Sequence, residues 1–153
     1  MSSHTRRHAG QALVEMALVF VILLTVIFGG VNALQNLAVQ FTISQAVRTA
    51  AHEAALMGST GGMEDSHVYA LSTAPGPVAD AARNVLAGGV FTTDVTKATI
   101  TATCAVSPCR RYSPITVQVQ YRDGYLAPLL MMTEIVVQRS TTRSSEKDQQ
   151  SDG

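Results

Sequence analysis

The hydrophobic pattern of the chain begins with one long apolar segment. From Ala12 to Leu34 nearly every residue is apolar, and residues 16–47 contain no Asp, Glu, Lys or Arg. A helix that crosses a bilayer needs about 20 consecutive apolar residues, so this segment is long enough to span a membrane. Arg6 and Arg7 precede it. Positive charge gathers on the cytoplasmic side of spanning helices, which predicts a cytoplasmic N-terminus and an extracytoplasmic remainder.

The helical pattern continues beyond this span. No proline interrupts the chain before Pro75, and Gly58, followed by Gly61 and Gly62, offers a stop. We therefore predict one continuous helix from Ala12 to Met57, which at about 1.5 Å per residue is about twice as long as a bilayer core is thick. Its outer half is expected to pack on the rest of the chain through four residues near helical spacing: Leu37, Phe41, Ala46 and Ala50.

The remaining pattern predicts one short helix and a small sheet. Residues 58–76 are a connector rich in Gly, Ser, Thr and Pro, and Pro77 to Ala87 carry apolar residues on one helical face before two glycines. After that the period changes to two, as in half-buried antiparallel strands. The expected strands cover residues 99–106, 115–122 and 133–139, with Ile100, Val117 and Val119 facing the long helix.

These elements predict an α+β fold with four segments. Residues 1–10 are a short basic leader, and residues 11–57 form the long helix with its transmembrane half. Residues 58–139 form an extracytoplasmic α+β domain. Residues 140–153 contain no apolar side chain, so they cannot contribute to a core and are expected to be a disordered tail.

Composition and motifs argue against catalysis. The 11 basic and 11 acidic residues cancel, so no overall field favours nucleic acid as a partner. His52 and Glu53 begin like a His-Glu-x-x-His zinc helix, but the second histidine is missing, and the four histidines are scattered. The chain has no Gly-x-Ser-x-Gly, no Gly-x-Gly-x-x-Gly and no Walker loop. We expect no enzyme activity, no cofactor and no metal.

The two cysteines predict a disulfide. Cys104 and Cys109 are separated by four residues, a spacing that does not fit a Cys-x-x-Cys redox or zinc pair. In an extracytoplasmic domain the natural interpretation is a bond between them, with free thiols as the alternative. Such a short loop removes little entropy from the unfolded chain, so the bond would fix a turn.

Glu15 is the one charged residue within the apolar segment from Ala12 to Leu34. A carboxylate near the bilayer centre costs on the order of 3 kcal/mol or more, so a functional partner would explain its presence. The alternative is that Glu15 lies at the headgroup level without any partner.

The leader junction carries a family resemblance. Gly10-Gln11-Ala12-Leu13-Val14-Glu15 is similar to the junction of type IV pilin-like proteins. Three longer stretches resemble TadE-like minor pseudopilins of the tight-adherence (Flp) pilus system: the run from Gly10 to Val19, the later run from Gln45 to Ala55 and, mostly in strand pattern, Val117-Gln118-Val119-Gln120-Tyr121 followed by Pro128-Leu129-Leu130.

The resemblance implies a processed membrane protein. It implies that a prepilin peptidase cuts after Gly10 and leaves Gln11 as the new N-terminus. Glu15 of one subunit would then pair with the Gln11 ammonium group of a neighbour, which offsets its desolvation. The implied partners are the peptidase, other pilin or pseudopilin subunits and membrane lipid. The implied function is that of a minor pseudopilin in pilus assembly and surface attachment, in a single-pass membrane location.

Two other functions fit parts of the pattern. Residues 1–33 could be an ordinary signal peptide of a secreted protein, cut after Val31-Asn32-Ala33, although Glu15 within its apolar region argues against this. The chain could also be an uncleaved, single-span anchored binding protein. The mature N-terminus separates the three: Gln11, Leu34 or the original start.

Overall fold

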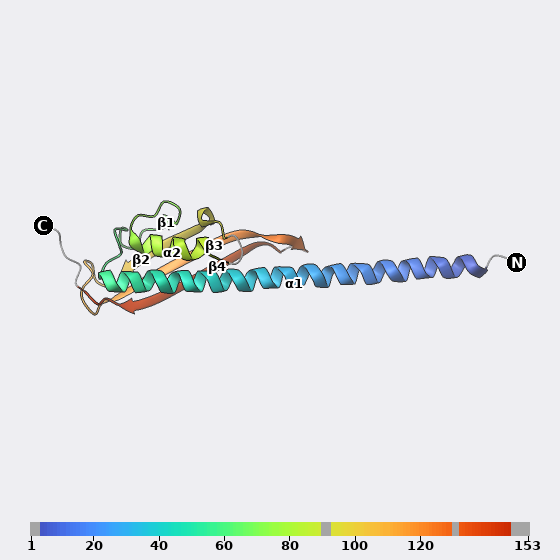
Figure 1. The fold of residues 1–153 in the computed structure, drawn as a ribbon, viewed down its shortest axis with the longest axis horizontal. Helices are drawn as coiled ribbons and strands as arrows, with labels where there is room; N and C mark the ends of the chain where they lie inside the picture. The colour runs from blue at the N-terminus through green and yellow to red at the C-terminus, as the bar shows by residue number, and fades with distance from the viewer. Residues whose placement is uncertain (1–3, 90–92, 130–131, 148–153) are drawn as a thin grey trace.

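A computed structural model describes residues 4–89, 93–129 and 132–147, with the side chains of residues 4–10 and 127–133 outside that description. One long helix, α1 (His4–Met57), runs the length of the molecule. Its N-terminal half stands free, and its C-terminal half packs against a small domain (Figure 1). The other elements are β1 (Tyr69–Ala70), α2 (Pro77–Ala87), the 3-10 turn η1 (Val95–Lys97), β2 (Ala98–Cys104), β3 (Pro114–Leu129) and β4 (Met132–Ser144).

The predicted α+β class is confirmed. The long helix is continuous through Gly29 and Gly30, where a Cβ atom would meet nothing within 4 Å. It begins at His4 rather than at Ala12. The leader contains no proline, and its one glycine, Gly10, lowers helix stability by only about 1 kcal/mol, so the helical pattern extends backwards through it.

The sheet is antiparallel and has the order β1-β2-β3-β4. Ile100 lies opposite Val119, and Ala102 lies opposite Val117. Their side chains are fully buried, whereas Thr99, Thr101 and Thr103 on the other face are only partly buried. The alternation therefore sets one apolar face, and α1 and α2 contribute their apolar stripes to the same core.

The predicted contact face of α1 is wrong in its first half. Ala46 and Ala50 are fully buried, but Leu37 and Phe41 are 64% and 65% exposed. The step from Phe41 to Ala46 is five residues, which turns well away from one face of a helix with 3.6 residues per turn. The stripe that packs keeps steps of three and four: Asn32, Gln35, Val39, Ile43, Ala46, Ala50 and Ala54.

The predicted tail also starts too early. β4 continues to Ser144, and residues 140–144 pair with residues 114–118 of β3. Ser145 is 1% exposed, and the N–H of Glu146 donates to the carbonyl of Ala55 at 2.9 Å. Backbone pairing with a strand already in place needs no apolar side chain, so composition alone was misleading here. Residues 148–153 of the predicted tail lie outside the described residues.

The hairpin of β3 and β4 is longer than the alternation predicted. β3 reaches Leu129 instead of Arg122, with a register shift between Gly124 and Leu129. The short strand β1 lies within the predicted connector. Gly76 ends that connector at φ +85°, and a Cβ there would overlap the backbone of Gly61, so this tight approach requires glycine.

Candidate functional site

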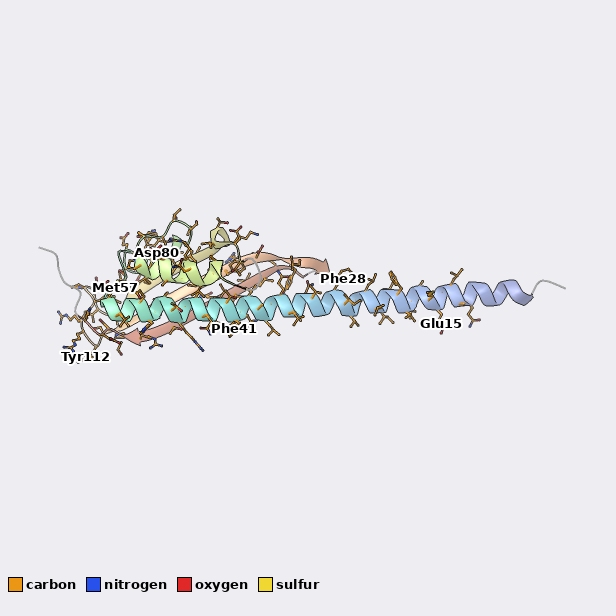
Figure 2. The ribbon with its side chains drawn as sticks, in the orientation of Figure 1. Glu15, Phe28, Phe41, Met57, Asp80 and Tyr112 are labelled. Carbon is orange, nitrogen blue, oxygen red and sulfur yellow. A yellow bond between two sulfur atoms is a disulfide. The ribbon has the colours of Figure 1, made fainter. Side chains whose placement is uncertain are left out.

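The residues of the leader junction lie on the free half of α1. Gly10 has a helical backbone, and Gln11 and Glu15 are both exposed. Glu15 lies four positions after Gln11, which is about one turn and about 6 Å along the axis. Glu15 projects from the free helix (Figure 2), and no hydrogen bond or ion pair joins it to the side chains that the structure describes. Any partner of Glu15 therefore lies outside these described side chains.

The free half of α1 has the composition of a membrane span. The helical segment Gln11–Met57 contains a window of 18 residues with mean hydropathy 2.6, none of which is buried within the protein. Large side chains such as Leu18, Phe20 and Ile22 are more than half exposed. Exposed apolar residues on all sides of a helix are typical of contact with lipid, and this helix fits a single-pass membrane anchor.

A buried glutamine joins α1 to the hairpin where the domain begins. Gln35 is 7% exposed. Its Nε2 donates to the carbonyl of Gly124 at 3.4 Å, and its Oε1 accepts from the N–H of Leu126 at 3.0 Å. These two bonds satisfy backbone groups at the register shift of β3, where the ladder is interrupted. Sequence reasoning missed this role, although a polar residue in phase with Val39 and Ile43 was a usable signal.

An open cleft of about 670 Å³ lies beside this junction, lined by Gln35, Thr93, Asp94, Lys97, Asp123, Gly124, Tyr125 and Leu126. Two of its three charged residues, Lys97 and Asp123, bind each other. Lys97 Nζ lies 2.6 Å from Asp123 Oδ1, and the Tyr121 hydroxyl donates to Asp123 Oδ2 at 2.7 Å. Asp94 accepts from the backbone and the hydroxyl of Thr96. This network fixes η1 against β3.

The network shifts the ionisation of its members. Burial raises the pKa of Asp123. The hydrogen bonds from Lys97, Tyr121 and the Gly124 N–H together lower the pKa by more than burial raises it, so the pKa lies below 3.8. The hydrogen bond to Asp123 raises the pKa of Lys97 above 10.5. Burial, followed by the bond to Asp123, raises the pKa of Tyr121. All three residues therefore keep their ordinary charge states at neutral pH.

The predicted disulfide is confirmed. Cys104 and Cys109 are bonded and buried, and they close the connection between β2 and β3. The N–H of Cys104 also donates to Asp65 at 2.9 Å, which ties the connector after α1 to the end of β2. The bond lies at the end of the domain far from the free half of α1.

No metal site is found in the part of the chain that the structure describes, where no three His, Cys, Asp or Glu residues are grouped for coordination. His52 is exposed on α1, and Glu53 beside it is half-buried. The structure does not bring them into contact with Glu15, which lies on the free half of the helix (Figure 2).

Comparison with known families identifies the N-terminal segment. Residues 10–52 match the family model described as TadE-like protein. The N-terminal segment of this chain is TadE-like. The match begins at Gly10 of the leader junction, includes Glu15 and Gln35, and ends within the buried stripe of α1. It associates the chain in general terms with the tight-adherence pilus. No curated protein and no solved structure gives a significant match.

Proposed function

We propose that this TadE-like protein is a minor pseudopilin-like subunit that takes part in assembly of the tight-adherence pilus and in surface attachment. The observation that carries the proposal is the TadE-like match, which starts at the glycine of the leader junction and covers most of the long helix. The exposed apolar half of α1 supports it, because such a surface needs lipid or other helices around it. The domain of about a hundred residues favours a minor subunit over a bare helical one.

Processing after Gly10 is part of this proposal. A prepilin peptidase must reach the peptide bond between Gly10 and Gln11, which lies within the helical part of the chain. Local unwinding is easier at glycine, which is about 1 kcal/mol less favourable in a helix than alanine. A bulky residue at position 10 would strengthen the local helix and would also crowd the site that accepts the residue before the cut.

Glu15 is proposed as an assembly residue. Its carboxylate has no partner among the described side chains, and it begins the charge-free segment of α1. In a bundle of such helices the new ammonium group of Gln11 on a neighbour would pair with it. A paired charge is tolerated in a low-dielectric environment where a lone one is costly, so the pair would also fix the axial register between subunits.

The proposed topology places the domain outside the cytoplasm. Arg6 and Arg7 lie before the span, which favours a cytoplasmic N-terminus. The disulfide between Cys104 and Cys109 supports the same orientation, because such bonds persist in oxidising compartments.

The first test is the mass of the mature N-terminus. A terminus at Gln11 supports the proposal. A terminus at Leu34 would indicate a signal peptide, and the original start would indicate an uncleaved anchored protein. Either result would contradict processing at Gly10.

The second test compares Gly10→Phe with Glu15→Gln. Gly10→Phe should leave unprocessed precursor in the membrane. Glu15→Gln lies beyond the cut and should be processed, but its entry into pili should fall because the neighbour's ammonium group loses its partner. Precursor size and pilus incorporation are measured for both. Normal pilus incorporation of Glu15→Gln would show that Glu15 is an interfacial residue without this role.

A further inference from the structure

The end of the β3–β4 hairpin lies beside the membrane-spanning part of α1. We define the hairpin end as residues 125–129 together with Met132, where Leu129 pairs with Met132. The antiparallel pair of β3 and β4 extends along α1 towards the free half of the helix, beyond the rest of the domain (Figure 1). Leu126, the last of these residues in β3 whose side chain is described, is 65% exposed.

The level that the hairpin end reaches follows from its bonds to α1. Gln35 binds the backbone of Gly124 and Leu126, so the hairpin end starts at the level of Gln35. Three more residues of strand advance about 10 Å, which corresponds to about seven residues of helix. The hairpin end therefore reaches the level of Phe28, which Figure 2 shows beside the ends of the strands.

The outer boundary of the hydrocarbon core lies on the domain side of Phe28, so the hairpin end reaches into the depth of the bilayer. If the hydrocarbon core starts after Glu15, about 20 helical residues cross it, which brings its outer boundary near Gln35. Phe28 and Val31 on α1 are about 40% exposed and face out at the same depth as the hairpin end. A protein domain held clear of the membrane would not have strands at this depth.

The sequence of the hairpin changes character at the same place. Residues 126–132 are all apolar, and charged residues return at Asp123 on β3 and Glu134 on β4. Asp123 pairs with Ile135 and Gly124 pairs with Glu134, so both charged residues lie at the base of the hairpin end, on its two opposite faces. A hairpin with an apolar end and a charged base matches the change from acyl chains to headgroups.

We propose that the hairpin end inserts into the interfacial region of the outer leaflet beside α1, so that the domain rests on the membrane at two points. The depth is about 5–10 Å, as for other interfacial elements. The free backbone edge of β4 prevents deeper entry, because unpaired backbone groups are not tolerated in the hydrocarbon core. The proposal rests on the membrane anchor and the orientation within the proposed function, and it does not require pilus assembly.

The test uses single tryptophans, because the natural chain contains none. Leu126→Trp is the test variant, with Phe28→Trp as the control within the span. Tyr112→Trp is the control outside it, because Tyr112 is 71% exposed and lies at the opposite end of the domain (Figure 2). Each full-length protein is reconstituted into phosphatidylcholine vesicles, and the emission is measured with and without brominated acyl chains.

We expect bromination to reduce the emission of Leu126→Trp clearly, with that emission at short wavelength, but less than the emission of Phe28→Trp, because Leu126 lies at the level of Gln35 and Phe28 about 10 Å deeper. Tyr112→Trp should lose little emission. Quenching at position 126 as weak as at position 112 would overturn the proposal. Short-wavelength emission without quenching would also overturn it, because it would show that another protein surface covers Leu126. If Phe28→Trp itself is not quenched, the membrane anchor fails, which is a separate result.

Discussion

Gln35 shows how much a single polar residue determines in this protein. It occupies a position in the charge-free segment where composition predicts only apolar contacts, and it binds two backbone groups about ninety positions later in the chain. Glu15 and the cysteine pair could be identified from the sequence, because a charge among apolar residues and a short cysteine spacing are local signals. The partner of Gln35 could not, because the register shift in β3 appears only when the strand is paired.

Gln35→Ala should lower the free energy of unfolding by about 1–3 kcal/mol, because it removes two hydrogen bonds to the backbone of Gly124 and Leu126, each worth about 0.5–1.5 kcal/mol. Gln45→Ala is the matched control: Gln45 is on the same helix and half-buried, and its side chain makes no hydrogen bond to the described residues. Denaturation in detergent gives the stability, and hydrogen exchange at the Leu126 amide gives the local effect. Equal losses in both variants would contradict the role of Gln35.

The ion pair of Lys97 and Asp123 predicts a pH dependence with a definite sign. The folded pKa of Asp123 lies below 3.8, so its contribution is present above that value and is lost as pH falls through the folded pKa. The folded pKa of Lys97 lies above 10.5, so its contribution is present below that value and is lost as pH rises through the folded pKa. Asp123→Asn should therefore lower the free energy of unfolding at neutral pH. The difference in this free energy between the variant and the natural protein should become smaller in acid. A gap that widened in acid would contradict this assignment.

At the scale of elements, the sequence predicted which helices and strands form better than it predicted which of their faces pack together. The long helix, α2 and the three main strands follow from the period of the apolar residues. The face of α1 does not, because Leu34, Leu37 and Phe41 form as good a local stripe as Gln35, Val39 and Ile43. The polar residues on the stripe that contains Gln35 made that stripe resemble the solvent-exposed face of the helix. Tertiary contact, rather than hydropathy, decides between the two.

The end of β4 gives the test at this scale. A chain that stops after Arg139 loses the pairing of residues 140–144 and the bond from Glu146 to Ala55. Each lost hydrogen bond contributes about 0.5–1.5 kcal/mol, so the thermal midpoint should fall clearly. A chain that stops after Lys147 keeps these contacts and should melt like the full protein. Equal midpoints for the two truncated chains would show that residues 140–147 are as dispensable as composition predicted.

At the scale of the whole molecule, the two halves of α1 have different roles: one half is free of the domain and the other half packs into its core. Residues 11–31 of α1 are exposed apart from the half-buried Leu24, and the first buried residue of the packed stripe is Asn32. The free half therefore contributes surface for lipid or for other helices, and the packed half contributes to the core. The sequence predicted these two halves, but not that the hairpin would follow α1 back to the span, because that depends on how β3 and β4 lie along the helix.

Two N-terminal truncations test this separation. A chain that begins at Val31 keeps the whole packed stripe, so its domain should unfold cooperatively in water with the disulfide formed. A chain that begins at Gln40 loses the buried residues Asn32, Gln35 and Val39. Burial of an apolar side chain such as Val39 is worth about 1.5–3 kcal/mol, and the two hydrogen bonds of Gln35 to the hairpin are lost as well. The shorter chain should therefore have a clearly lower midpoint and faster exchange at Leu126. If the chain beginning at Val31 failed to fold, the free half of α1 would have to support the domain itself, and the division of the helix into an anchoring half and a folding half would be wrong.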